Sequence, residues 1–167
     1  MMAIKNVLVP TDFGEAADSA LAYGQELARR FGATLYVVHI AQNIYLQAFG
    51  AETYAAMAPR LQEQLEREAR AELDALLANA DTKYPPTKSV VMTSSTPAYA
   101  IVDYAKEHEI DLIVMGTHGR GPFAHVVMGS VAERVVRSAP CPVLTVRHPE
   151  HEFVWPDAIA AKARVPA

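Results

Sequence analysis

Short apolar runs alternate with longer segments of helical periodicity along most of this chain. The runs have little polar alternation, which is typical of strands covered on both faces of a parallel sheet. They comprise residues 6–9, 35–40, 90–92, 111–115 and 143–146. Strands that alternate with helices imply right-handed parallel crossovers. We therefore expect an α/β fold of Rossmann-like type, an open five-stranded parallel sheet with helices on both faces.

Local signals mark where the intervening helices begin and end. Residues 12–15 and 130–133 each resemble a capping box, in which a polar side chain caps the first turn. Gly32 stands where a helix commonly ends in the left-handed conformation, and Pro97 occupies the favoured first position of another helix. The second helix should be long and amphipathic, with a charged stripe that we interpret as solvated. Its expected apolar face consists of Leu61, Leu65, Ala69, Leu73 and Leu76.

The composition of the 167 residues fits one globular domain, because 51% are hydrophobic and 20% are charged. We assign this domain to residues 1–147 and treat 148–167 as a C-terminal tail without a separate domain. The formal net charge is −4 and no basic stripe is interleaved with aromatic residues, which argues against nucleic-acid binding. No apolar run has membrane-spanning length and the start lacks a leader-like segment, so we expect no membrane partner and a cytoplasmic location.

The cysteine and the histidines carry no recognisable metal or redox motif. Cys141 is the single cysteine, which excludes an internal disulfide and a cysteine zinc cage. Because it lies between two prolines at the start of the last strand, we interpret it as a buried, inert thiol. His39 and His125 have no carboxylate or cysteine at convincing metal-binding spacing. We therefore predict no metal ligands in the protein itself.

A glycine-rich segment after the fourth predicted strand contains the strongest functional signal. Gly116, Gly119 and Gly129 have the spacing Gly-x2-Gly-x9-Gly-Ser, with Ser130 at the expected start of a helix. Glycines allow backbone N–H groups to approach an anion closely, and a helix N-terminus adds unpaired donors and a positive dipole end. The spacing is neither that of a P-loop nor that of a dinucleotide fingerprint. The segment nevertheless indicates phosphate binding.

Simpler interpretations of these residues remain open at the level of local pattern. Ordinary turns would also explain the glycines, and helix capping would explain Ser130 and Asp12. In an open sheet, ligands bind beyond the carboxyl ends of the strands, where the strand order reverses. Segments 10–12 and 116–130 meet there only if the first and fourth strands are neighbours, which local pattern does not establish.

Several segments are shared with a known protein family. They are Pro10-Thr-Asp-Phe13, Val38-His-Ile40, Val114-Met-Gly-Thr-His-Gly-Arg120, Gly129-Ser-Val-Ala-Glu133 and Pro140-Cys-Pro-Val-Leu-Thr-Val146. Through them the chain resembles the universal stress protein family, in particular its nucleotide-binding branch, over residues 4–147. The resemblance implies the strand order 3-2-1-4-5, which brings the two candidate segments together. It also implies a homodimer formed through the last strand.

The resemblance further implies a cleft for ATP or another adenine nucleotide. Asp12 and the backbone at Ile40 would hold the adenine end. That side of the cleft would be lined by Pro10, Thr11 and Met115. The ribose and phosphates would be held by Gly116, Gly119, Gly129, Ser130 and Val131. Mg²⁺ or Mn²⁺ would be coordinated mainly by phosphate oxygens and water, because the glycine-rich segment has no carboxylate cluster.

The implied function is ATP binding by a nucleotide-responsive dimer in the stress response. We identify no catalytic nucleophile or base, so any ATP hydrolysis should be slow. One alternative is a nucleotide-metabolising enzyme of the same architecture, with slow hydrolase or transferase activity. A second alternative is a dimeric protein-interaction module with an empty cleft. The intact set of glycines favours nucleotide binding over that module.

Gly119→Val is expected to abolish nucleotide binding while the dimer persists. The valine side chain would occupy the space through which a phosphate must approach the backbone. Calorimetric titration with ATP and size-exclusion chromatography would measure the two properties. Wild-type affinity in the variant would contradict this placement of the phosphates.

Overall fold

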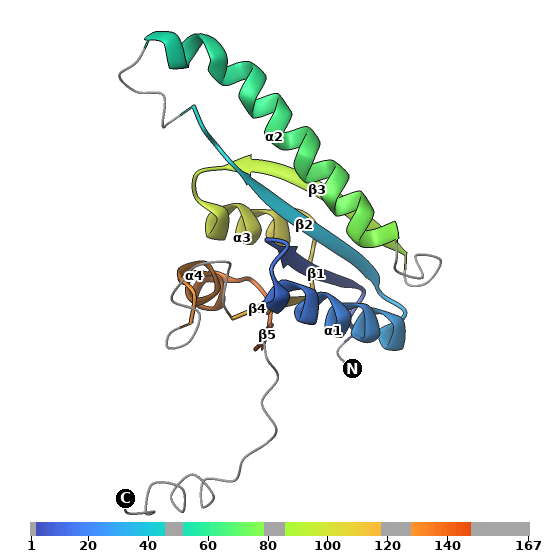
Figure 1. The fold of residues 1–167 in the computed structure, drawn as a ribbon. Helices are drawn as coiled ribbons and strands as arrows, with labels where there is room; N and C mark the ends of the chain where they lie inside the picture. Colours follow the sequence, from blue (N-terminus) through green and yellow to red (C-terminus); the bar gives the residue numbers. More distant parts are fainter. Residues whose placement is uncertain (1–2, 46–51, 79–85, 118–127, 148–167) are drawn as a thin grey trace, which may run out of the picture.

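Strands and helices alternate along the chain, as the sequence predicts. The computed structural model describes residues 3–45, 52–78, 86–117 and 128–147. Its elements are β1 (Asn6–Thr11), α1 (Glu15–Phe31), β2 (Thr34–Gln42), α2 (Glu52–Ala78), β3 (Thr87–Ser94), α3 (Pro97–Glu107), β4 (Leu112–Gly116), α4 (Ser130–Ser138) and β5 (Val143–Val146). All neighbouring strands are parallel, in the order β3-β2-β1-β4-β5 (Figure 1). The expected five-stranded Rossmann-like sheet and its order are confirmed.

The pairing between β1 and β4 is the shortest in the sheet. β1 pairs with β2 along its whole length, whereas its register with β4 ends at the pair Leu8 and Ile113. The carbonyl of Asn6 accepts a hydrogen bond from the N–H of Asp111 at 2.9 Å, so alternate residues of β1 direct their backbone groups toward β4. Pro10 belongs to this set and has no N–H to donate. The backbone pairing between β1 and β4 therefore ends before the carboxyl ends of these strands.

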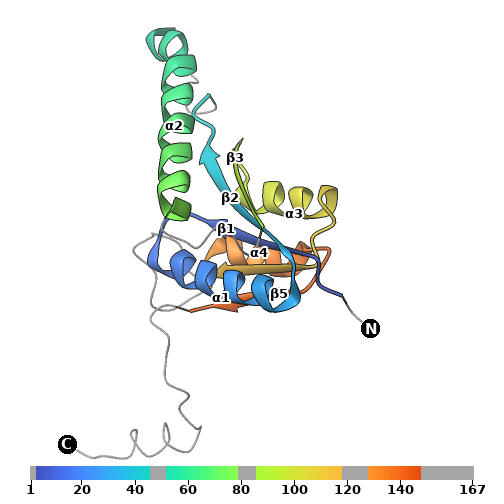
Figure 2. The same ribbon diagram turned by 90° about the vertical axis from the view of Figure 1, so that its right-hand side faces the viewer.

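Two hydrophobic clusters cover the two faces of the sheet, because successive strand side chains point to opposite sides. The first cluster joins the strands to α1 and α2 and includes Val7, Val9, Ala20, Leu35, Val37 and Leu73. The second joins them to α3 and α4 and includes Leu8, Tyr36, Val38, Ile101, Ile113 and Val135. Figure 2 shows α2 and α3 on opposite sides of the strands. Helices therefore bury both faces, as predicted.

Glycine residues, rather than the expected polar side chains, precede α1 and α4. The N-cap of α1 is Gly14 and that of α4 is Gly129, and among the described residues neither helix has a side-chain capping hydrogen bond. The capping boxes predicted at 12–15 and 130–133 are therefore wrong. β1 extends beyond its expected end to Thr11, and the N-cap of α1 falls on Gly14. Ser130 already belongs to the first turn of α4, so the N-cap of that helix is Gly129.

The other two predicted helix ends are confirmed. Gly32 follows α1 in the left-handed conformation, with φ 63°. The N–H of Ala33 then donates to the carbonyl of Ala28 at 2.9 Å, which satisfies one of the last carbonyls of the helix. Pro97 is the first residue of α3, where its missing N–H costs no helical hydrogen bond.

α2 is longer than expected, and only part of its predicted apolar face is buried. The helix contains Pro59 within its N-terminal half. Ala69 and Leu73 are buried as predicted, whereas Leu61 is 39% exposed, so its assignment to the apolar face is wrong. The buried position beside it belongs to the polar residue Gln62, which is 4% exposed. The side chain of Gln62 is therefore buried at this turn of α2, where the sequence pattern predicts that Leu61 is buried.

The buried amide of Gln62 is satisfied by hydrogen bonds to the segment after β2, to β3 and to α2 itself. Its Oε1 accepts from the N–H of Ile44 at 3.1 Å, and its Nε2 donates to Glu66 Oε1 at 3.1 Å and to Thr93 Oγ1 at 3.4 Å. The Thr93 hydroxyl donates to the same Glu66 oxygen at 2.6 Å. Burial of an amide without partners would be costly. These bonds therefore fix α2 near the carboxyl ends of β2 and β3.

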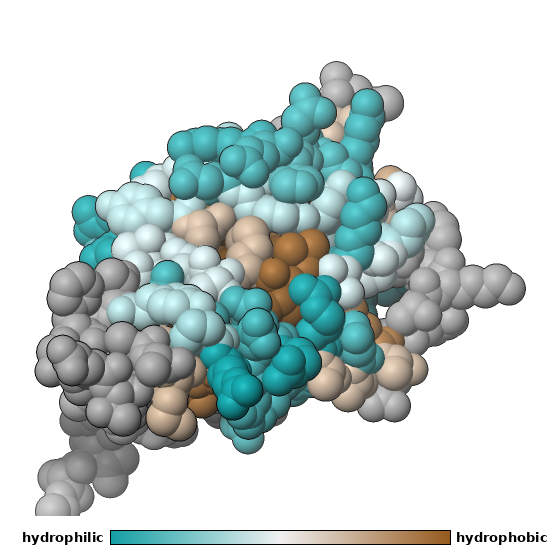
Figure 3. Space-filling model, turned by 90° about the horizontal axis from the view of Figure 1, so that it is seen from above, coloured by the Kyte–Doolittle hydropathy of each residue, from teal (hydrophilic) through white to brown (hydrophobic). Residues whose placement is uncertain are grey.

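The outer side of α2 is solvated, in agreement with the interpretation of its charged stripe. Arg67 and Glu63 form an ion pair at 3.7 Å, with side chains 71% and 69% exposed. Such exposed pairs contribute little to stability. Seen from above, this face of the molecule is mostly hydrophilic around an apolar patch in its middle (Figure 3). The stripe is a water-facing surface and carries no assigned function.

Gly24→Ala is expected to destabilise the fold, although alanine is the better helix former. A Cβ at this position of α1 would overlap with Cγ2 of Val9, a fully buried side chain of β1. Overpacking a core typically costs about 1–3 kcal/mol, against a gain of about 1 kcal/mol in helix propensity. Urea unfolding would measure the net effect, and Ala22→Gly at an exposed position of α1 would measure the propensity term. An unchanged free energy of unfolding for Gly24→Ala would show that Val9 moves aside without cost.

Candidate functional site

The carboxyl ends of β1 and β4 form the point where the strand order reverses. α1 follows β1 on one face of the sheet and α4 follows β4 on the other, since the two helices belong to different hydrophobic clusters. The backbone ladder between these strands ends at Leu8, before the carboxyl ends of both strands. In folds of this type, ligands bind in the crevice at such a switch point. Segment 10–12 and the start of the glycine-rich segment both lie at this edge.

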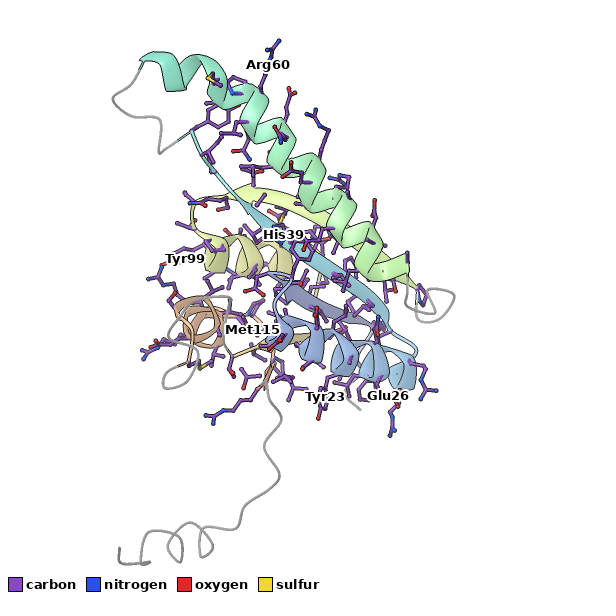
Figure 4. All side chains as sticks on the ribbon, viewed as in Figure 1. Tyr23, Glu26, His39, Arg60, Tyr99 and Met115 are labelled. Atoms are coloured by element: carbon purple, nitrogen blue, oxygen red, sulfur yellow. The ribbon has the colours of Figure 1, made fainter. Side chains whose placement is uncertain are left out.

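Three predicted site residues share one apolar surface. Met115 near the end of β4 is buried in the cluster on the α3–α4 face. Ile40 near the end of β2 and Val131 in the first turn of α4 pack against the same cluster. Figure 4 labels Met115 together with His39, the neighbour of Ile40. The fold thus brings three elements that are distant in the sequence to one wall of the candidate site.

Pro10 and Thr11 are the last residues of β1, and the prediction that they form a loop is wrong. The strand continues because β2 pairs with it as far as Thr11. The hydroxyl oxygen of Thr11 accepts a hydrogen bond from the N–H of Phe13 at 3.0 Å, and Asp12 Oδ1 accepts one from the N–H of Gly14 at 3.1 Å. The carboxylate of Asp12 is thereby held in the turn between β1 and α1.

Phe13 and His39 are two residues at this edge that the sequence did not indicate. Their rings stack with centroids 4.4 Å apart and an angle of 28° between the planes. His39 Nδ1 lies 2.9 Å from the carbonyl oxygen of Thr11, and because a carbonyl only accepts, Nδ1 donates. Phe13 has φ 61°, a conformation that is rare for an aromatic residue. No local signal indicates this conformation, because phenylalanine itself disfavours it.

The N-termini of α1 and α4 both lie at this edge of the sheet. Each helix begins after a glycine, and neither has a side-chain capping hydrogen bond in the described part of the chain. The first N–H groups of a helix have no partner within the helix, and the helix dipole adds partial positive charge there. Two such ends at one edge of the sheet suit an anion.

A backbone hydrogen bond joins the two described ends of the glycine-rich segment. The N–H of Gly129 donates to the carbonyl of Thr117 at 2.7 Å, and the N–H of Thr117 donates to the carbonyl of Val146 at 2.8 Å. Because Thr117 directly follows β4, α4 starts beside the end of that strand. Gly119 and the tail 148–167 lie outside the described residues.

Gly116 has a packing role that the phosphate interpretation did not include. A Cβ at this position would lie 2.9 Å from both the carbonyl carbon and the oxygen of Ala16, and 3.0 Å from its Cβ. The absence of a side chain therefore allows β4 and the first turn of α1 to approach closely. The contribution of Gly116 to phosphate binding stays a prediction.

The electrostatics of Cys141 agree with an unreactive thiol. Burial raises the pKa of this half-buried thiol, and the nearby charge of Asp111 raises it further. A raised pKa keeps the sulfur protonated at neutral pH, and the thiolate is the reactive form. Among the described residues, no group of three or more His, Cys, Asp or Glu side chains is placed to hold a metal ion. The described helices include none with the length and apolarity needed to cross a membrane.

Comparison with known proteins identifies the family. The model of the universal stress protein family matches residues 3–147. The chain belongs to this family. A universal stress protein of Thermus aquaticus is 34% identical over 146 residues, which cover 86% of this chain and 98% of the relative.

Solved structures of universal stress proteins have the same fold. UspA from Lactobacillus plantarum has a TM-score of 0.71 and 29% identity, covering 87% of this chain and 99% of that chain. A universal stress protein in complex with cAMP has a TM-score of 0.55 and 24% identity, with coverages of 86% and 97%. The protein from Archaeoglobus fulgidus in complex with dAMP has a TM-score of 0.58 and 22% identity, with coverages of 87% and 99%.

Gly116→Ala is expected to lower the free energy of unfolding by about 1–3 kcal/mol, because the new Cβ would press against the backbone of α1. Adding Ala16→Gly should not restore stability, since two of the three close contacts involve backbone atoms of Ala16. Urea unfolding of the single and double variants would measure these effects. Wild-type stability in Gly116→Ala would refute the packing role of this glycine.

Proposed function

We propose that this universal stress protein binds ATP or another adenine nucleotide at the carboxyl ends of β1 and β4 and acts as a nucleotide-responsive dimer in the stress response. The observation that carries the proposal is that the N-termini of α1 and α4, each behind a glycine N-cap, both lie at the carboxyl edge of the sheet, beyond the last pair of β1 with β4. Helix N-termini of this kind favour phosphate groups. The family structures in complex with cAMP and dAMP support an adenine nucleotide as the ligand class.

The adenine end of the nucleotide is proposed to lie near β1 and β2. Ile40 and Met115 supply apolar surface there, since both pack on the α3–α4 side of the sheet. A planar, apolar base with polar edges requires such a surface together with a few fixed polar groups. The backbone of Ile40 and the carboxylate of Asp12 would supply these groups. Pro10 and Thr11, at the end of β1, complete this side of the proposed cleft.

The ribose and phosphates are proposed to lie between the glycine-rich segment and α4. The donors would be backbone N–H groups in the first turn of α4, which contains Ser130 and Val131 and follows Gly129. Gly116 and Gly119 would leave room for the phosphates to approach. Mg²⁺ or Mn²⁺ would then be held mainly by phosphate oxygens and water, which is the usual mode for magnesium at nucleotides.

We propose that the site binds nucleotide and hydrolyses it slowly at most. Fast phosphoryl transfer requires a positioned nucleophile and cationic groups that stabilise the transition state. The carboxylate of Asp12 accepts a hydrogen bond from the N–H of Gly14, which supports a role in shaping the turn. We assign no catalytic residue.

The dimer is proposed to form through β5. In the described sheet, β5 is an edge strand that pairs with β4 alone. Leu144 on this strand is 38% exposed and Thr145 beside it is exposed as well. Pairing with a second β5 would satisfy the open backbone groups and bury these side chains. We place this dimer in the cytoplasm.

The Ser130→Glu variant is expected to lose affinity for nucleotide while it keeps its stability. A carboxylate in the first turn of α4 interacts favourably with the helix dipole, so stability should be retained. The same charge would repel phosphates and is expected to weaken ATP binding by about tenfold or more. Ser138→Glu, at the other end of α4, is the matched control and should retain wild-type affinity. Calorimetric titration with ATP and Mg²⁺ would give the affinities, and thermal unfolding would report on folding.

Different outcomes would contradict different parts of the proposal. No nucleotide in the purified protein by mass spectrometry, together with no binding heat for ATP, would refute nucleotide binding. Equal ATP affinities in the two serine variants would refute the placement of the phosphates. Rapid phosphate release over many turnovers would favour the enzymatic alternative. A monomer in sedimentation velocity experiments would refute the dimer.

A further inference from the structure

We infer that His39 and Phe13 form a positioning pair that fixes the adenine end of the proposed site from the opposite face of the sheet. This inference rests on the proposed function and adds two residues to it. Neither residue is assigned a contact with the nucleotide. Their role is to hold the turn between β1 and α1 in the shape that presents Asp12 beside Ile40.

The pair connects the ends of β1 and β2. Thr11 and His39 are partners in the register of the two strands, and Thr11 is the last residue of β1. His39 Nδ1 donates to the carbonyl of Thr11 at 2.9 Å, where the backbone ladder ends. The imidazole also stacks on the ring of Phe13, with centroids 4.4 Å apart. The His39 side chain thus contacts the chain on both sides of Asp12, at the carbonyl of Thr11 and at the ring of Phe13.

The backbone of Phe13 shows why such support is needed. Its φ of 61° is in the left-handed region, which is strained for a residue other than glycine. Such conformations persist when surrounding contacts determine them and are concentrated at functional sites. Here the contacts are the His39 ring and the hydrogen bond from the N–H of Phe13 to Thr11 Oγ1 at 3.0 Å. Without the stack, the turn would relax to other conformations.

The pair and the proposed nucleotide wall lie on different faces of the sheet. Phe13 packs against the hydrophobic cluster of α1 and α2, whereas Ile40 and Met115 pack with α3 and α4. His39 immediately precedes Ile40, and Phe13 immediately follows Asp12. The stack therefore couples the two groups proposed to hold the adenine end without occupying the space of the base. Its loss should affect recognition of adenine more than contact with phosphates.

We expect the wild-type protein to bind GTP more weakly than ATP. His39→Ala is expected to weaken ATP binding by about tenfold and to leave GTP binding within about twofold, so that discrimination between the two nucleotides is lost. A purely structural defect would lower both affinities equally. Thermal unfolding of each variant would confirm that it is folded. Phe13→Tyr, which keeps the stacked ring, should retain wild-type discrimination, and Phe13→Gly, which removes it while allowing positive φ, should behave like His39→Ala.

The chain offers a matched control at the other end of the sheet. His108 stacks on Tyr104 with ring centroids 3.8 Å apart, and its Nδ1 lies 3.0 Å from the carbonyl oxygen of Tyr104. His108→Ala therefore removes the same two kinds of contact at the C-terminal end of α3 and should leave both nucleotide affinities unchanged. Equal losses of ATP and GTP affinity in His39→Ala, or no loss, would overturn the positioning role alone. Absence of nucleotide binding by the wild-type protein would overturn the proposed function and this role with it.

Discussion

The backbone ladder between β1 and β4 is limited by one constraint, the missing N–H of Pro10. Alternate residues of β1 direct their hydrogen-bonding groups toward β4, and Pro10 is the one among them that cannot donate. The ladder between the two strands ends before it, at Leu8. The strands then continue into helices on opposite faces of the sheet. This arrangement places a helix N-terminus on either side of the carboxyl edge, which is where ligands bind in folds of this type.

Close packing of α1 determines how near its N-terminus comes to that crevice. Gly24 on the helix faces Val9 of β1, and Gly116 at the end of β4 faces Ala16 in the first turn of α1. In each pair, the missing side chain allows a helix and a strand to approach within van der Waals contact. The glycine that begins the predicted phosphate segment thus also sets the position of a helix on the other face. Gly116 thus serves both the packing of α1 against β4 and the proposed binding of phosphate.

The two faces of the sheet contribute differently to the candidate site. On the α3–α4 face, Ile40, Met115 and Val131 provide apolar surface. On the α1–α2 face, Phe13 packs in the core and stacks on His39. The alternation of strand side chains makes this division possible, because neighbouring residues such as His39 and Ile40 point to opposite sides. A strand can therefore supply one face with a binding surface and the other with the contacts that hold its loop.

The sequence by itself determined the strands and helices, the left-handed Gly32, the helix start at Pro97 and, through family resemblance, the strand order and the candidate residues. These features depend on periodicity and on the conformational preferences of adjacent residues, which can be read along the chain. The tertiary structure alone decided that Gly14 and Gly129, rather than Asp12 and Ser130, are the N-caps, that Gln62 is buried, that Gly116 packs on Ala16 and that Phe13 stacks on His39. Each of these depends on strand register or helix docking, which are set by contacts between distant segments and leave no local pattern.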